Sequence, residues 1–161
     1  MSRYHMQNRK DREIISQEEL NRILKQGRFV TIALCRGDEP YIVTLSYGYD
    51  ASRHALYFHC ARQGLKLDFM RDNPRVCATV IEDGGYIPDE CAHAYRSVVL
   101  WGQLSVVGKQ DEREHGMRVL IEHLESNASQ IERLFGNAAG SWERMQVLRL
   151  TIDEMTGKAG Q

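Results

Sequence analysis

The amino-acid sequence predicts a mainly β protein with flanking helices, built as a six-stranded antiparallel barrel. Runs of β-branched and apolar residues recur along the chain and are separated by turn-forming residues. Most of these runs follow one another through short turns, which favours hairpins over the strand–helix–strand order of a parallel sheet. The few helical patterns fall between the strand runs, where helices at the rim of a small barrel would lie.

Length and charge limit what the chain can be. It has 161 residues, of which 42% are hydrophobic, and this fits one globular domain over residues 1–161. Lysine and arginine number 21 against 22 aspartate and glutamate, so we expect no broad charged surface for nucleic acid or a membrane. Residues 1–11 are polar and lack an apolar run, so they predict neither a signal peptide nor an anchor. We therefore expect a cytoplasmic protein.

The four cysteines predict neither disulfides nor a metal site. Cys35, Cys60 and Cys77 lie inside apolar strand runs, and Cys91 has no nearby partner in the sequence. No Cys-x-x-Cys motif occurs, although Cys91 and His93 together make half of a possible ligand set. We therefore expect reduced thiols and no bound metal.

The first elements are a helix and a group of strands. A serine and a glutamate three residues apart form a capping box and predict a helix over 17–26. The β-branched runs at 28–36 and 41–47 predict two strands joined by a tight turn. A further turn leads to a third strand over 55–60, which we expect to pair with the second.

The rest of the chain supplies three more strands and three helices. A glycine-rich segment at 84–90 has the composition of a loop. We expect residues 1–15 to form an N-terminal arm and 111–138 a helical insertion before the last strand, with the ordered chain ending near 158. Helices are predicted over 64–73, 111–126 and 129–135. Strands are predicted over 76–81, 95–107 and 145–152.

One turn has the chemistry of an anion site. The sequence contains no phosphate-binding loop, no dinucleotide-binding fingerprint and no nucleophile elbow. After His59, however, a strand end passes through a polar turn into a helix start at Gly64. The first amides of that helix lack intrahelical acceptors, and Lys66 adds a positive charge, so the turn suits a phosphate. Alternatively, Arg62 and Lys66 are solvated charges beside a tight turn.

Seven segments together resemble a known family. They are RKDREI (9–14), PYIVTL (40–45), YFHCA (57–61), GLKLD (64–68), NPRV (73–76), YRSVV (95–99) with Gly102, and TGK (156–158). In order and spacing they resemble the FMN-binding split β-barrels related to pyridoxamine 5'-phosphate oxidase, in particular the nitroimidazole-resistance branch. This resemblance spans most of the chain.

The resemblance implies that FMN lies at the interface of a homodimer. Lys66 would neutralise the FMN phosphate, and His59 would lie beside the cofactor and act on the substrate. Many relatives carry a polar residue where this chain has Leu65, so Arg62 or Arg96 would have to supply a second phosphate cation. The residues implied at the cofactor are Tyr41, Val43, Thr44, Leu45, Phe58, His59, Arg62, Lys66 and Ser97.

Other candidate residues have simpler interpretations. Without the resemblance, His59 would be a hydrogen-bonded packing residue. Cys60 points to the opposite strand face and is expected in the core. Trp101 lies in an apolar strand, where a tryptophan usually packs instead of binding a ligand. His115 and His123 do not have the spacing of paired metal ligands on a helix, so we expect both at the surface.

The resemblance implies an FMN-dependent oxidoreductase that reduces a small acceptor such as a nitroaromatic compound. Flavin chemistry requires no catalytic triad, which agrees with the motifs present. Oxidation of pyridoxamine phosphate is less expected, because no cationic cluster is evident for a second phosphorylated ligand. The alternative is a non-catalytic flavin- or haem-binding protein for storage, sensing or haem handling, with His59 as an iron ligand. Haem and a deazaflavin are the alternative cofactors.

Overall fold

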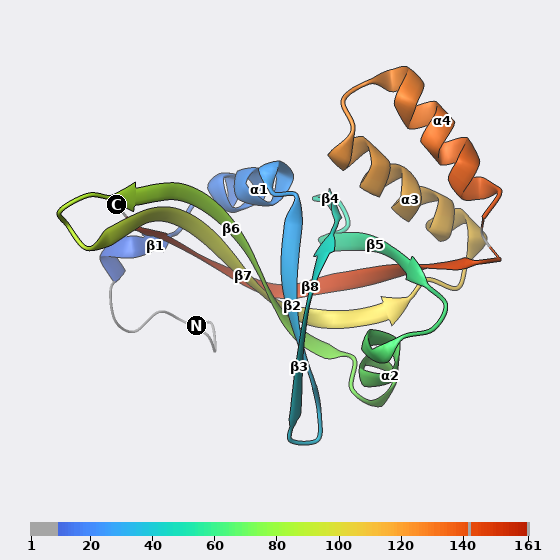
Figure 1. Ribbon diagram of the computed structural model, residues 1–161, viewed down its shortest axis with the longest axis horizontal. Helices are drawn as coiled ribbons and strands as arrows, with labels where there is room; N and C mark the ends of the chain where they lie inside the picture. The colour runs from blue at the N-terminus through green and yellow to red at the C-terminus, as the bar shows by residue number, and fades with distance from the viewer. Residues whose placement is uncertain (1–9, 142, 161) are drawn as a thin grey trace.

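The computed structural model describes residues 10–141 and 143–160, and its strands form one curled antiparallel sheet (Figure 1). The strand order is β3-β2-β6-β7-β8-β5-β4, and β1 pairs with β8. The prediction of a mainly β, antiparallel fold with flanking helices is confirmed. The strands are β1 (Glu13–Ile14), β2 (Phe29–Arg36), β3 (Glu39–Ser46), β4 (Gly48–Asp50), β5 (Ala55–Ala61), β6 (Arg75–Ile87), β7 (Ala92–Val106) and β8 (Met145–Gly160). The helices are α1 (Gln17–Gln26), α2 (Leu65–Asp72), α3 (Gln110–Leu124) and α4 (Ala128–Ala139), and Lys10–Arg12 form a 3-10 turn.

The sheet curls without closing into a complete barrel. Its outermost strands are β3 and β4, which follow each other in the chain through Tyr47. The sheet has eight strands in place of the predicted six, because β1 and β4 are too short to produce a periodic pattern. Helix α2 packs against β2 and β3.

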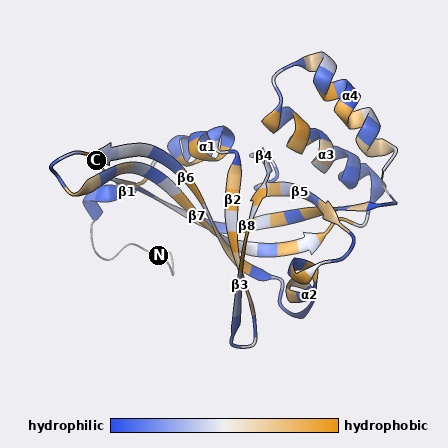
Figure 2. Ribbon diagram, viewed as in Figure 1, coloured by the Kyte–Doolittle hydropathy of each residue, from blue (hydrophilic) through white to orange (hydrophobic). Residues whose placement is uncertain are grey.

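One face of the sheet, which we call the inner face, encloses the main core. Alternate residues of β2, Val30, Ile32 and Leu34, are buried there, as the two-residue period of a strand requires. Figure 2 shows apolar and polar residues alternating along the long strands. A second, smaller cluster around Tyr57 and Val147 lies under α3. Each side of the curled sheet near α3 therefore has its own apolar layer.

Helix α1 has the predicted bounds. The Ser16 hydroxyl accepts a hydrogen bond from the Glu19 amide at 3.3 Å. Leu20, Ile23 and Leu24 form its buried stripe. In the last turn of α1, the Leu24 carbonyl accepts a hydrogen bond from the Tyr47 hydroxyl at 2.7 Å, which joins the helix to the residue before β4.

The predicted pairing of the third strand is wrong. That strand is β5, and it pairs with β8 and with β4, whereas β3 pairs with β2. After β3 ends at Ser46, the chain passes through the buried Tyr47 and forms β4 before it reaches the turn at residues 51–54. This insertion separates β3 from β5. The β5–β8 pairing instead joins Ala55 to Thr151, far apart in the sequence.

Two predicted strand ends were also too short. The segment 84–90 was expected to be a loop, but β6 continues to Ile87 and forms a hairpin with β7. Its two glycines mark an irregularity in this ladder, where Gly85 has a φ of +90° and the register shifts after Asp83. The last strand was predicted over 145–152, but β8 runs on to Gly160, past the predicted end of the ordered chain near 158, and pairs with β7 and β1.

Helices α3 and α4 form a pair that stands beside the sheet, before β8 in the chain (Figure 1). Helix α3 begins at Gln110, one residue before the predicted start at 111, and Lys109 is its N-cap residue. Asn127 caps α4 by accepting bonds from the Ser129 and Gln130 amides. Throughout the described ranges, every helix is too short or too polar to cross a bilayer.

Candidate functional site

The β5–α2 turn places a lysine at an uncapped helix start. Gly64 precedes α2 with a φ of +146°, a conformation that favours glycine. No side chain caps α2, so its first amides are available to an external acceptor. Lys66 lies in this first turn and is half-buried. In residues 10–141 and 143–160, it has no ion-pair partner. The turn therefore has the charge and the donors that a phosphate requires.

The two arginines considered as a second phosphate cation are both engaged elsewhere. Arg62 donates to the Glu143 carbonyl at 2.8 Å, which ties the turn to the segment before β8. Arg96 lies 3.3 Å from the Glu19 carboxylate and 3.9 Å from that of Glu82, beside α1. Both guanidinium groups therefore already have partners, whereas Lys66 has no ion-pair partner in the described residues.

The side chains of β5 alternate between core and exterior. Phe58 and Cys60 lie in the main core, whereas His59 is exposed. Tyr57 shares the face of His59 but is buried beneath α3. Burial raises the pKa of the Cys60 thiol, and the nearby charge of Lys66 lowers it by a smaller amount. Cys60 thus lies in the core, as predicted, and His59 is the residue of β5 that a ligand outside the core can reach.

The predicted residues of β3 are divided between two faces. Tyr41, Val43 and Leu45 pack against the main core, and the Tyr41 ring lies 5.1 Å from that of Phe69 on α2. Thr44 points to the opposite face and is exposed. The first three residues can therefore contact a ligand through their main chain, while Thr44 also offers its hydroxyl.

The sheet has a second, outer face, which carries a polar row. The register aligns Thr44, Thr31, Thr79, Val99 and Thr156 across five strands. The hydroxyl oxygens of Thr31 and Thr44 are 3.0 Å apart and share a hydrogen bond. Ser97 lies on the same face of β7, two residues before Val99. The structure thus places Thr44 and Ser97 on one face but about three strand spacings, or ~14 Å, apart.

The outer face also exposes large apolar side chains. Phe29, Ile42 and Ile81 are 64%, 66% and 62% exposed, on β2, β3 and β6. These three strands are adjacent in the sheet. Apolar side chains gathered in this way on one face are typical of an interaction surface.

The two histidines of α3 were expected at the surface. This prediction is wrong for His123, whose ring nitrogens both bond within the fold, whereas the His115 side chain is still 33% exposed. His123 Nε2 donates to the Gly27 carbonyl, 2.6 Å away, and its Nδ1 accepts from the Tyr49 amide at 3.3 Å. His115 Nε2 lies 2.7 Å from the carboxylate of Asp50. Burial raises the pKa of Asp50, but bonds from Ser52, His115 and the Arg53 amide outweigh burial and lower it. Both histidines attach α3 to the sheet.

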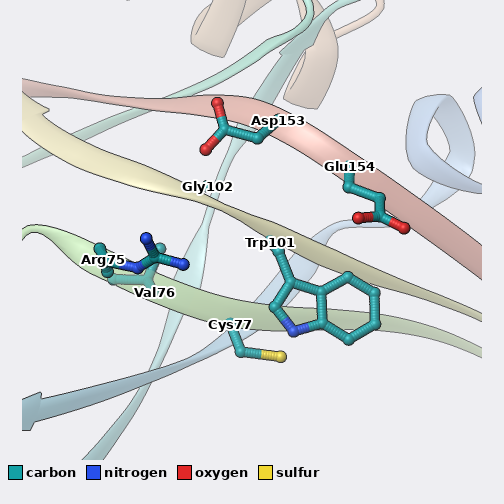
Figure 3. Close-up of a pocket in the computed structure, with 7 residues that line it drawn as sticks. All are labelled: Arg75, Val76, Cys77, Trp101, Gly102, Asp153 and Glu154. Atoms are coloured by element: carbon teal, nitrogen blue, oxygen red, sulfur yellow. The ribbon is translucent and has the colours of Figure 1, made fainter. Parts of the chain in front are cut away.

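A pocket of about 340 Å³ opens beside β6, β7 and β8 (Figure 3). The sequence predicted that Trp101 packs in the core, but it lies half-buried in the wall of this pocket. No sequence motif marked the site, because its residues come from three separate strands. Its lining residues are Arg75, Val76, Cys77, Trp101, Gly102, Asp153 and Glu154.

The fold and its sequence can now be compared with known proteins. Residues 16–159 match the model of the pyridoxamine 5'-phosphate oxidase family. The chain belongs to this family. The predicted resemblance is thereby confirmed. An uncharacterized protein of Rhizobium meliloti is 30% identical over 112 residues, which cover 66% of this chain and 68% of that protein.

Solved structures of three proteins share the fold. A candidate 5-nitroimidazole antibiotic resistance protein of Bacteroides thetaiotaomicron aligns with a TM-score of 0.71 and 21% identity, covering 91% of this chain and 86% of that one. An FAD-binding protein of Mesorhizobium loti gives a TM-score of 0.66 and 24% identity over 91% and 96% of the two chains. An FAD and heme binding protein of Mycobacterium smegmatis gives 0.71 and 19% over 93% and 74%.

Proposed function

We propose that this protein binds FMN and uses it to reduce a small acceptor such as a nitroaromatic compound. The observation that carries the proposal is the half-buried Lys66, without an ion-pair partner in the described residues, at the uncapped start of α2. This arrangement lies on the scaffold of the pyridoxamine 5'-phosphate oxidase family. The relatives named as FAD-binding proteins support a flavin, and the one named for 5-nitroimidazole resistance supports the acceptor class.

The residues present fit a flavin phosphate. Lys66 and the first amides of α2 would hold it, and nothing within 4 Å of Gly64 would meet a Cβ there, so the approach to the turn is open. The hydroxyls of Thr44 and Ser97 face outward, and the core-facing residues of β3 would contribute main-chain contacts. Bound flavin would supply the two-electron redox chemistry. His59, exposed at the end of β5, would orient the acceptor.

A homodimer is part of this proposal. Phe29, Ile42 and Ile81 would lose their exposed apolar area against a second copy of the chain. The outer face, which carries Thr44 and Ser97, would then lie between the two copies. A cofactor held there would be shielded from water by both protomers.

The experiment that tests flavin binding compares two flavins and two variants. Lys66→Glu should weaken FMN binding by about tenfold or more, because a carboxylate replaces the phosphate's counter-charge. Riboflavin lacks the phosphate, so the affinity of Lys66→Glu for riboflavin should stay within about twofold of the affinity of the wild-type protein. Lys25→Glu, an exposed charge reversal on α1, is the matched control. Unchanged FMN affinity in Lys66→Glu, measured by fluorescence titration, would reject the phosphate role.

A second candidate function is non-catalytic haem or flavin binding. Its support is the exposed imidazole of His59 and two relatives of the same fold, the FAD and heme binding protein and a flavocytochrome of Azotobacter vinelandii. An absorbance spectrum of the purified protein separates the candidates, since haem gives a sharp Soret band and flavin two broad bands. If haem binds through His59, His59→Ala should abolish the Soret band. If FMN binds, His59→Ala should instead slow nitroaromatic reduction while FMN affinity is kept.

A further inference from the structure

The two ends of α2 are held in different ways. At its C-terminal end, the Asn73 amide donates to the Phe69 carbonyl at 2.8 Å, and the Asn73 side chain donates to the Cys35 carbonyl of β2 at 3.0 Å. The Phe69 ring is buried in the main core. At the N-terminal end, Gly64 and Leu65 are exposed, and no side chain caps the helix. The position of this end therefore depends on the residues that lead into it.

Arg62 continues the pairing of β5 with β8 beyond the last backbone pair. That pair joins Ala61 to Met145. The next residue, Arg62, donates from its guanidinium group to the Glu143 carbonyl at 2.8 Å. In the opposite direction, the Gln146 side chain donates to the Arg62 carbonyl over 3.5 Å, at the long limit of a hydrogen bond. These contacts fix the place and the direction in which the chain leaves the sheet.

The start of α2 follows this exit within two residues. The Gly64 carbonyl accepts a hydrogen bond from the Leu67 amide at 2.9 Å, which closes the first turn of the helix. The amides of this turn point where the chain from Arg62 to Gly64 directs them, and a hydrogen bond weakens steeply when its angle falls. The amides therefore require a fixed helix start, whereas the flexible stem of Lys66 can follow a phosphate.

We propose that Arg62 is a positioning residue for the phosphate turn. By holding the Glu143 carbonyl, Arg62 orients the first amides of α2 toward the FMN phosphate, and it does not contact the phosphate itself. This role rests on the FMN site proposed at Lys66. It differs from the role of a second phosphate cation that the sequence resemblance implied, because the guanidinium group already donates to a main-chain acceptor.

The same contact links the helical insertion to the phosphate turn. Glu143 follows α4 and precedes β8 in the chain. The Arg113 guanidinium group of α3 donates to the Met145 carbonyl at 3.3 Å, so the chain beside Glu143 is also held from α3. Helices α3 and α4 are therefore part of the frame that holds the phosphate turn in place.

Titrations of Arg62→Met with two flavins test this role. Loss of the bond that fixes the amides should weaken FMN binding by about fivefold, whereas riboflavin, which lacks the phosphate, should bind within about twofold of its wild-type affinity. Salt screens the attraction between unlike charges. The decrease of FMN affinity with salt should therefore be the same in Arg62→Met as in the wild type, but smaller in Lys66→Met, which removes the counter-charge of the phosphate. Arg133→Met, on α4 and well apart from α2 (Figure 1), is the matched control and should keep the wild-type affinity.

A second measurement requires no flavin. Amide hydrogen exchange followed by NMR reports how firmly the first turn of α2 is closed. In Arg62→Met, the Leu67 amide should exchange about fivefold faster than in the wild type. The Asn73 amide, at the other end of the helix, should stay within about twofold of its wild-type rate, which also verifies that the variant is folded.

Four results would overturn the proposal. Unchanged FMN affinity in Arg62→Met shows no role for this residue at the site, and equal losses of FMN and riboflavin affinity show a general effect on the fold. A weaker salt dependence in this variant shows that Arg62 contacts the phosphate directly. Unchanged exchange of the Leu67 amide shows that Arg62 does not hold the turn. If the wild-type protein binds no FMN, the function proposed at Lys66 fails, while the exchange of Leu67 still decides whether Arg62 positions the helix start.

Discussion

The two faces of the sheet differ in how far one copy of the chain buries their apolar side chains. On the inner face, Val30 and Ile32 of β2 are fully buried in the main core. On the outer face of the same strand, Phe29 is largely exposed and Thr31 bonds to Thr44. The inner face is covered within one copy of the chain, whereas the outer face leaves large apolar side chains exposed beside its threonines. Among the residues proposed at the cofactor, Thr44 and Ser97 lie on the outer face, whereas Tyr41, Val43, Leu45 and Phe58 face the core.

The largest expected effect contrasts a phenylalanine on each face. Phe58→Ala should lower the free energy of unfolding by about 3–5 kcal/mol, because it leaves a cavity where the ring is 0% exposed. Phe29→Ala should lower it by less than about 0.5 kcal/mol when measured on the dissociated protomer, since that ring is 64% exposed. Urea titrations at low protein concentration give both values. Equal losses in the two variants would remove the distinction between the faces.

An intermediate effect is expected on association. Ile81→Glu places a charge on the outer face, and it should raise the dimer dissociation constant by about tenfold or more. The physical reason is that a carboxylate would be buried without a partner between the two copies. Ile15→Glu is the control, because Ile15 is 86% exposed and lies between β1 and α1, on neither β2, β3 nor β6. Sedimentation velocity that shows a monomer for the wild type at all concentrations would refute the proposed dimer.

The smallest expected effect tests whether neutral His123 attaches α3 to the sheet, as its two hydrogen bonds indicate. Burial lowers the pKa of His123 below its usual value of 6.5, as does the charge of Arg28, while the bond to the Gly27 carbonyl raises it. As the pH falls, His123 is therefore protonated in the unfolded chain before it is protonated in the folded protein. The stability that neutral His123 contributes to the fold is present above the unfolded pKa and is lost on acidification. The free energy of unfolding should therefore fall as the pH is lowered from about 7 to about 5.

His123→Gln keeps a polar group at this position but cannot titrate. Its free energy of unfolding should therefore change less between about pH 7 and pH 5 than that of the wild type, in parallel urea titrations. Asp50 does not interfere in this window, because its lowered pKa places its own transition at more acidic pH. Identical slopes for the variant and the wild type would show that His123 does not link α3 to the sheet through its neutral form.

Local patterns were sufficient to predict most elements of the fold. The capping box and apolar stripe gave the bounds of α1, and β-branched runs located β2, β3 and β5. They failed where distant segments meet, because nothing near β5 indicates that Ala55 pairs with Thr151. They failed also at Gly84 and Gly85, since glycine is common to loops and to irregular strands and only the hairpin partner distinguishes the two.

The candidate site was predictable to the extent that it is local. The turn from Arg62 to Lys66 is continuous in sequence, and its helix start could be read from residue types alone. The pocket that contains Glu154 could not, because it requires a register shift between β7 and β8 and a neighbour on β6. Alternation along β5 correctly separated His59 from Cys60, while the bonds of His123 depend on where α3 docks.

The position of β8 in the chain determines when the sheet can be completed during synthesis. Strand β8 lies between β5 and β7, yet it is made after both of them and after α3 and α4. While the ribosome has not yet released residues 145–160, one edge of β5 and one of β7 remain unpaired and open to other chains. The strands of the β2–β3 and β6–β7 hairpins are close in sequence, so these hairpins can form early. The pairing of β5 with β8, such as Phe58 with Leu148, can form only after β8 has been made. Newly made chains therefore depend on the last strand for protection against aggregation.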